Sequence, residues 1–299
     1  MRFGGHETFQ IREGWLNKGL RTLIENPELL AEDNFADRLG VGRNMGKSIK
    51  HWLTATGLAD LVPAPNSPKK KRLQVNDLGK IIFEYDPYFM ENGTWWALHV
   101  NLVNNPDFAY SWNWFFNIFN LIRFERAVCL EGLRQQLQFQ RNNMPAIKTL
   151  QRDLNCLLGS YAKRIPNEEE DPEDASYCPF IGLNLMSYYP SSGFYVLNNG
   201  IKKIHRELIG YSLAICSDNF SKGHEFVDVS IRDAAQIAGG PGRCFVLSNE
   251  TFFDIIQSIE DSGYNQDFNL SGSAGERLLR IRCKESFQWM KEFYQNNIN

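Results

Sequence analysis

The hydrophobic and polar positions over residues 34–57 are typical of an amphipathic helix that follows a shorter helix and a tight turn. At about 100° per residue, such a helix gathers its apolar side chains on one arc. Those side chains are Met45, Ile49, Trp52 and Leu53. The opposite side carries Arg43, Lys47 and Lys50, with Asn44 and His51 beside them. The pattern therefore predicts a helix with an apolar back and a cationic, hydrogen-bonding front.

The flanking residues complete the pattern of a winged helix-turn-helix. Phe35, Ala36 and Leu39 predict the short first helix, and the glycines of residues 40–42 predict the turn. Beyond Gly57, short strands at 58–62 and 73–75 enclose a proline-rich loop. This wing loop carries Lys69, Lys70, Lys71 and Arg72. Because wings commonly touch phosphates, contact with DNA or RNA is favoured over a packing helix whose basic face is merely solvated, and double-stranded DNA is the expected partner.

A second helix-turn-helix candidate covers residues 123–162. A helix at 125–139 is followed by a predicted turn at 141–143 and by a helix whose apolar positions share one arc. Lys148, Arg152 and Asn155 lie away from that arc, so this helix also has a cationic front. Cys156 falls on the same polar side, where a thiol near a cation can gain reactivity. A packing role for this cysteine is nevertheless favoured.

The fold class predicted is α+β, mainly helical, with two or three winged helix-turn-helix-like units joined by an aromatic-rich helical core over residues 88–124. Predicted domains are 1–122, 123–166, an acidic linker or loop at 167–175, and 176–299. In the last domain we expect strands at 180–185, 193–197 and 244–247, and helices at 201–217, 230–238, 250–259 and 274–294. A third winged-helix-like unit there would lack a basic front and would serve packing or partner contact.

Composition is that of a folded globular protein, with 299 residues of which 43% are hydrophobic and 13% aromatic. The net charge of −3 hides a local surplus, since residues 1–80 hold 13 Lys and Arg against 9 Asp and Glu. No stretch approaches the roughly 18 uncharged apolar residues of a membrane helix, and the amino terminus has no apolar run. We therefore expect a cytoplasmic protein without a membrane partner. The six cysteines form no C-x-x-C pair.

Cleavage of DNA would need a general base or a bound divalent cation such as Mg²⁺ or Mn²⁺ near the scissile phosphate. His6 and Glu7 are the clearest catalytic candidates, with Arg12 near enough in sequence to hold a phosphate. The favoured alternative is that His6 and Glu7 form a hydrogen-bonded structural cap. Residues 46–48, Gly-Lys-Ser, lack the spacing and the preceding strand of a P-loop, so no nucleotide or organic cofactor is indicated.

The amino-terminal string Gly-His-Glu-Thr-Phe at residues 5–9, followed by Arg12, Trp15, Leu16 and Lys18, is distinctive. It resembles the start of the uncharacterised domain family numbered four thousand and seven. The likeness continues at residues 39–45, 86–88, 105–116, 150–158 and 240–245, and so covers nearly the whole chain. One departure is Gly46, where a larger apolar residue is expected; this glycine would loosen the helix by up to about 1 kcal/mol relative to alanine.

The resemblance implies a role in bacterial defence loci that replace a non-bridging phosphate oxygen of DNA with sulfur. Its nearest relatives would be the SspB-like components, which are held to engage and nick DNA beside a cysteine desulfurase and a sulfur-transfer ATPase. Three hypotheses stay open: a DNA-recognition subunit, a metal-dependent nickase acting through His6 and Glu7, and a winged-helix transcriptional regulator that binds as a homodimer. DNA engagement within the modification system is favoured.

Overall fold

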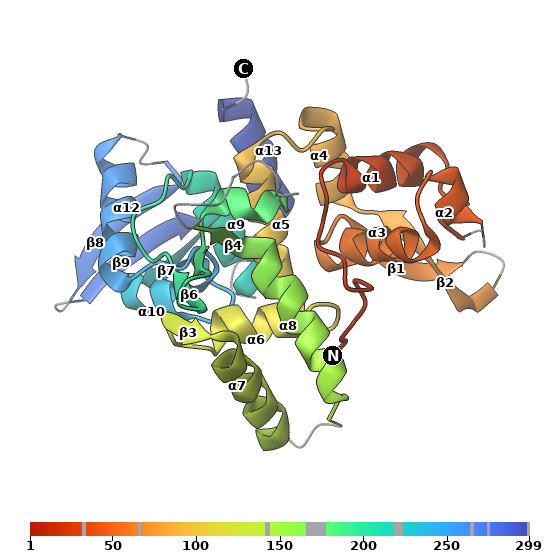
Figure 1. The fold of residues 1–299 in the computed structure, drawn as a ribbon. Helices are drawn as coiled ribbons and strands as arrows, with labels where there is room; N and C mark the ends of the chain where they lie inside the picture. The colour runs from red at the N-terminus through yellow and green to blue at the C-terminus, as the bar shows by residue number, and fades with distance from the viewer. Residues whose placement is uncertain are drawn as a thin grey trace. The chain divides into compact units, whose positions relative to one another are not determined.

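The computed structural model describes residues 1–31, 34–64, 67–140, 144–165, 178–217, 224–263, 266–273 and 276–297. The chain forms two compact units, unit 1 from Met1 to Leu197 and unit 2 from Asn198 to Asn299 (Figure 1). Both units mix helices and strands, so the α+β class is confirmed. The predicted boundary at 176 differs from this division, because residues 178–197 complete a sheet of unit 1.

The first part of unit 1 contains the predicted amphipathic helix and a hairpin. Its elements are α1 (Trp15–Glu25), η1 (Leu29–Ala31), α2 (Phe35–Arg38), α3 (Arg43–Ala55), β1 (Ala59–Ala64), β2 (Ser67–Val75) and α4 (Asp77–Tyr85). Ile49, Trp52 and Leu53 on α3 are fully buried, as their spacing predicts. β1 and β2 pair antiparallel, and α4 begins where the Asn76 side chain accepts a hydrogen bond from the Gly79 amide at 3.0 Å.

Two central helices, α5 (Asn92–Val103) and α6 (Tyr110–Asn117), are rich in aromatic residues. Trp112, Trp114 and Phe115 are each no more than 2% exposed. Their rings pack edge-on or tilted against neighbouring aromatic rings, the arrangement that the charge distribution of aromatic rings favours. The prediction that this region is a packed core is confirmed.

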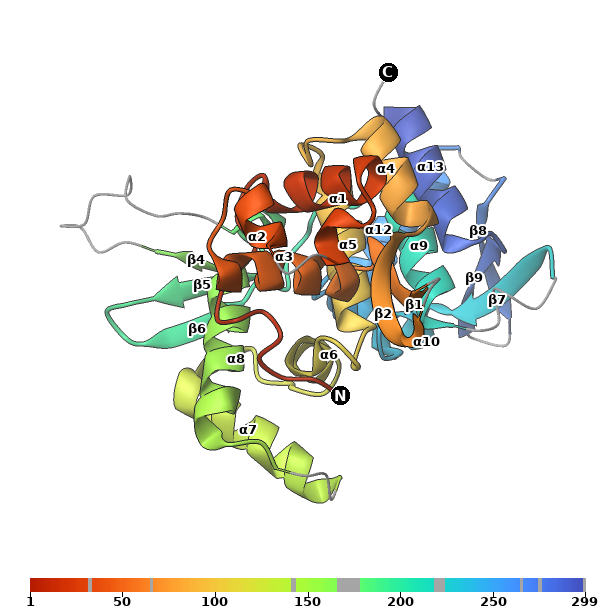
Figure 2. The same cartoon turned by 90° about the vertical axis from the view of Figure 1, so that its right-hand side faces the viewer.

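The second part of unit 1 joins a helical hairpin to a four-stranded sheet. Its elements are β3 (Arg123–Glu125), α7 (Arg126–Phe139), α8 (Ile147–Tyr161), β4 (Ala162–Arg164), η3 (Pro179–Leu183), β5 (Met186–Tyr189) and β6 (Phe194–Leu197). The strand order is β3-β6-β5-β4, and the β5–β6 hairpin extends beside α8 (Figure 2). The expected strand at 180–185 was wrong, because Pro179 opens a short 3₁₀ helix there and the strand begins at Met186.

In unit 2, a helix, a strand, two or more helices and a hairpin follow one another along the chain, in the same order as from α6 to β6 of unit 1. Its elements are α9 (Arg206–Cys216), β7 (Phe226–Ser230), α10 (Ile231–Gln236), α11 (Pro241–Cys244), α12 (Asn249–Asp261), β8 (Phe268–Ser273), β9 (Glu276–Arg282) and α13 (Ser286–Asn297). The strand order is β7-β9-β8. Trp289 on α13 is fully buried and lies where a side chain at Gly210 of α9 would stand.

Three predictions for unit 2 were wrong in type or extent. Residues 241–244 form a helical turn started by Pro241, where we expected a strand over 244–247. The helix expected from 274 begins only at Ser286, and α9 begins only at Arg206. The first part of the helix expected over 274–294 is instead the strand β9. This strand alternates buried Leu279 and Ile281 with exposed Arg280, which is the period of a strand.

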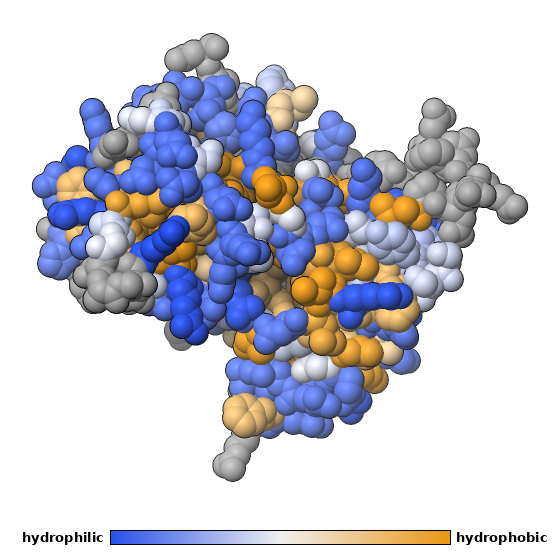
Figure 3. Space-filling view, turned by 90° about the vertical axis from the view of Figure 1, so that its left-hand side faces the viewer, coloured by the Kyte–Doolittle hydropathy of each residue, from blue (hydrophilic) through white to orange (hydrophobic). Residues whose placement is uncertain are grey.

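The surface combines hydrophilic residues with apolar patches (Figure 3). In unit 1, exposed apolar side chains flank β3, namely Ile118, Leu121, Ile122 and Val128. Among the described residues, no helix is both long enough and apolar enough to span a bilayer.

Candidate nucleic-acid interface

The front of α3 carries the predicted cations, and it adjoins the amino-terminal segment and the β1–β2 hairpin. Arg43, Asn44 and Lys47 are exposed, while Lys50 is half-buried. The Lys47 ammonium lies 3.6 Å from a carboxylate oxygen of Glu7, and the Lys50 ammonium stands 3.2 Å from the centre of the Phe35 ring. Arg43 and Asn44, in the first turn, are therefore the α3 side chains most available to an external ligand.

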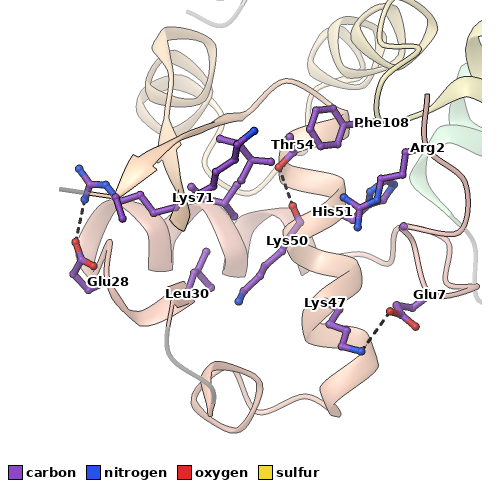
Figure 4. Close-up of a pocket in the computed structure, with 15 residues that line it drawn as sticks. Arg2, Glu7, Glu28, Leu30, Lys47, Lys50, His51, Thr54, Lys71 and Phe108 are labelled. Atoms are coloured by element: carbon purple, nitrogen blue, oxygen red, sulfur yellow. Dashed lines mark hydrogen bonds and ion pairs between the residues drawn. The ribbon is translucent and has the colours of Figure 1, made fainter. Parts of the chain in front are cut away.

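A cavity of about 420 Å³ opens between α3, the hairpin and the amino-terminal segment (Figure 4). Its floor is partly apolar, with Leu30, Leu73 and Phe108 among the lining residues. Its cationic lining consists of Arg2, Lys47, Lys50, Lys71 and Arg72.

The two carboxylates that line the same cavity, Glu7 and Glu28, already pair with lysine and arginine. Glu7 faces Lys47, and Glu28 lies 3.0 Å from a guanidinium nitrogen of Arg72. Five cationic residues thus surround two acids, so the cavity favours an anion such as a phosphate. Such an anion would compete with two internal ion pairs for its contacts.

His51 was expected on the exposed front beside the lysines, and the structure corrects that position. The side chain is 5% exposed and packs so closely on Gly5 that an added Cβ there would stand 2.5 Å from Nδ1. Burial, then the nearby His6 and Arg2, lower the pKa of His51 to about 3. At neutral pH this imidazole is uncharged and does not add to the cationic front.

Gly46 was expected to loosen α3, and the structure gives it a packing role instead. It is buried against α2, and a Cβ built there would lie 2.7 Å from the ring of Phe35 and 2.9 Å from Cβ of Ala36. Because any side chain would push α2 away, the glycine permits the close approach of the two helices.

The amino-terminal string ties α3, α6 and α8 together. His6 is 2% exposed and stacks on Trp52 of α3 at 6.0 Å between ring centres. Its Nδ1 accepts the Thr8 amide proton at 3.1 Å, so the ring proton sits on Nε2 and is donated to Asp153 Oδ1 at 2.9 Å. Figure 2 shows the segment running between these helices.

Asp153 of α8 is the centre of this network, which we call the Asp153 clamp. The same carboxylate accepts the Gly4 amide at 2.6 Å and the Ser111 hydroxyl of α6 at 2.9 Å. A buried carboxylate is tolerated when it receives several hydrogen bonds, and this one receives three, counting His6. With both ring nitrogens occupied, His6 has the geometry of a positioning residue.

Glu7 and Thr8 follow with left-handed backbone angles, φ 51° and 73°. Such conformations cost about 1–3 kcal/mol each outside glycine and persist only where the surroundings hold them. The turn keeps His6 pointing inward while Glu7 remains half-buried at the cavity. His6 and Glu7 therefore face different environments, and they do not form one exposed pair.

On α8, Lys148, Gln151, Arg152 and Asn155 are exposed along one side, which includes both predicted cations. Cys156 is instead 3% exposed, because η3 covers that flank of the helix. Burial, then Asp153 and Cys178, raise the pKa of the Cys156 thiol well above its usual value. The thiol is thus protonated at neutral pH, which corrects its placement on the polar side.

Several predicted features fall outside what the structure describes. The side chains of Lys69 and Lys70 and the acidic stretch 167–175 are among them, as is the turn at 141–143. Across the described residues, no three His, Cys, Asp or Glu side chains gather so that they could hold a metal ion. Mg²⁺ does not require such a cage of three or more protein ligands, because it is usually held by one or two carboxylates together with water and phosphate oxygens.

Comparison with known proteins agrees with this architecture. The family described as "Protein of unknown function (DUF4007)" matches residues 3–294. The chain belongs to that family. Its match begins with the string that forms the Asp153 clamp, so the distinctive amino-terminal motif of this DUF4007 chain has a structural role. No curated protein matches the sequence.

Two crystal structures share the fold of this DUF4007 protein. "Magnesium ion-bound SspB crystal structure" is 23% identical with a TM-score of 0.84, covering 98% of this chain and 88% of the other. "SspB crystal structure" is 24% identical with a TM-score of 0.83 and the same coverage. At these identities the likeness is one of fold.

Proposed function

We propose that this protein is the DNA-binding component of a bacterial DNA phosphorothioation system, acting beside a cysteine desulfurase and a sulfur-transfer ATPase. The observation that carries the proposal is the cationic cavity between α3 and the β1–β2 hairpin. A phosphate backbone is the ligand whose charge and extent suit it. The SspB-like fold supports the choice of system.

Topology supports winged helix-turn-helix units as the means of binding. In the order α6, β3, α7, α8, β5 and β6, the strands pair as β3-β6-β5, so the first strand lies beside the last. Unit 2 pairs its strands in the same way, as β7-β9-β8. A helix presented next to a hairpin in this manner fits a DNA groove while the hairpin contacts the backbone.

The proposal is tested by titrating fluorescent duplex DNA with the full chain at several salt concentrations. Arg43→Ala with Lys47→Ala should weaken binding to every duplex and reduce the slope of log K against log salt by up to about 1 for each lost phosphate contact. Lys80→Ala with Arg134→Ala removes two cations from α4 and α7, outside this cavity, and should leave the slope unchanged. If the two double variants have equal slopes of log K against log salt, DNA contacts another part of the protein.

Nicking remains a separate proposal, tested on supercoiled plasmid with Mg²⁺ or Mn²⁺ and with EDTA. Glu7→Gln is the informative variant, because it leaves the Asp153 clamp intact, whereas His6→Ala would remove a buried hydrogen-bond partner. Open circles that form with wild type and disappear with Glu7→Gln would assign the chemistry to this carboxylate. Binding without open circles would assign the cleavage to a partner protein.

A further inference from the structure

Helix α8 differs from α3 in the chemistry of the side chains it exposes. Lys148, Gln151, Arg152 and Asn155 recur with the spacing of one helical face, within an arc of about 100°. Gln, Arg and Asn are the side chains that form paired hydrogen bonds with adenine and guanine edges in the major groove. The α3 front, by contrast, is dominated by lysine and arginine beside a cavity, a composition suited to phosphates.

Three of the four polar side chains that α8 exposes make no polar or ring contact within the described part of the chain. The side chains of Lys148, Gln151 and Arg152 make no hydrogen bond, ion pair or ring contact with any residue that the structure describes. The α3 lysines, in contrast, are engaged by Glu7 and by Phe35. Side chains that give up no internal contact on binding can present their donors and acceptors to base edges without that cost.

The hairpin beside α8 forms a second cavity with it, of about 590 Å³. Gln151 and Asn155 line one wall, and Tyr188 and Tyr195 of the β5–β6 hairpin line another. The two tyrosine rings stack at 4.5 Å between centres. Arg126, at the start of α7, donates a hydrogen bond to Asn155 Oδ1 at 3.2 Å and so orients that amide. The helix, the hairpin and the start of α7 therefore present one polar surface.

We infer that α8 reads base sequence in double-stranded DNA through Gln151, Arg152 and Asn155, while the α3 cavity holds the phosphate backbone. This assignment rests on the proposed function and deepens it. Asp153 lies between two of the reading residues on the same helix but points into the clamp, so no carboxylate of α8 faces the DNA. The clamp also fixes the rotation of α8 about its own axis, and with it the direction of the reading face.

The test is selection from a pool of random-sequence duplexes by the full chain at about 0.15 M salt, with the bound fraction sequenced. Wild type should enrich a motif. Gln151→Ala with Arg152→Ala should lose the preference at the positions read, since each good base contact discriminates about 5- to 150-fold. The ratio of affinities for the motif and for an unrelated duplex should then fall at least about tenfold.

Two controls separate the explanations. Gln138→Ala with Arg134→Ala removes the same residue types from α7 and should keep the wild-type motif. Arg43→Ala with Lys47→Ala should bind all duplexes more weakly and still select the same motif. Retention of the motif by the α8 variant, its loss in the α3 variant, or binding without any motif would overturn the inference. Failure of wild type to bind any duplex would instead refute the proposed function, and the inference with it.

Discussion

The burial of His51 makes the stability of unit 1 depend on pH in a way that can be calculated. The pKa of this imidazole falls from 6.5 to about 3 on folding. A lowered native pKa means that, between these values, the unfolded chain binds a proton that the folded chain does not. The stabilisation is therefore complete above pH 6.5 and is lost as the pH falls towards 3.

The magnitude at an accessible pH follows directly. A pH of about 5 lies roughly 1.5 units below the pKa of His51 in the unfolded chain, and each pH unit corresponds to about 1.36 kcal/mol. His51 should therefore remove about 2 kcal/mol from the free energy of unfolding between about pH 7.5 and pH 5. His51→Gln cannot titrate, so its loss over the same range should be smaller by that amount.

Urea unfolding followed by tryptophan fluorescence measures this difference, because six of the seven tryptophans lie in unit 1. The free energy of unfolding of each protein is compared at the two pH values. The pH dependence that comes from titratable groups common to both proteins then cancels, and so does the cost of the substitution at neutral pH. An identical pH-dependent loss in wild type and in His51→Gln would refute the burial argument. It would return His51 to the exposed front of α3.

The remaining predictions concern packing, charge and thiols. Gly46→Ala should lower the free energy of unfolding, measured by urea titration, by about 1–3 kcal/mol, because its Cβ would overlap Phe35 and Ala36. Gly182→Ala is the control and should change this free energy far less, because the nearest atom to its added Cβ would lie 3.8 Å away. Glu28→Gln should raise DNA affinity by up to about fivefold in an anisotropy titration, since it frees Arg72 from an exposed ion pair; weaker binding would contradict a phosphate role for that arginine. A thiol reagent such as Ellman's should modify Cys216 and Cys283 in the native protein and spare the buried Cys129, Cys156, Cys178 and Cys244, with all six reacting in urea; rapid native labelling of Cys156 would contradict its burial.

Periodicity along the sequence predicted the helices well where one face is apolar. The bounds of α7 agree with the predicted 125–139 to within one residue, and the buried arc of α3 agrees for three of its four apolar residues, with Met45 only half-buried. The periodicity failed at β9, because this strand lies only a few residues before α13. The apolar positions of the two elements together resemble one long helix. Local pattern alone cannot separate such neighbours.

The candidate site was predictable in its charges but not in its burial. Arg43, Lys47, Lys148 and Arg152 are exposed, as the helical angles indicate. His51 and Cys156 also lie on predicted polar flanks, yet the amino-terminal segment covers the first and η3 covers the second. Both covers come from distant parts of the chain, so the angle of a residue on its own helix does not reveal them.

The Asp153 clamp has a consequence for the order in which the protein folds during translation. Two of its three hydrogen bonds, those from His6 and from Gly4, join residues that are 147 and 149 positions apart in sequence. At about 5–20 residues per second, a ribosome adds Asp153 roughly 7 to 30 s after His6. Throughout that interval the Gly4 amide and the His6 ring lack the Asp153 carboxylate that accepts their hydrogen bonds. The amino-terminal segment can therefore reach its final hydrogen-bonded position only after α8 has been made, and a fragment that stops short of α8 would lack the Asp153 clamp.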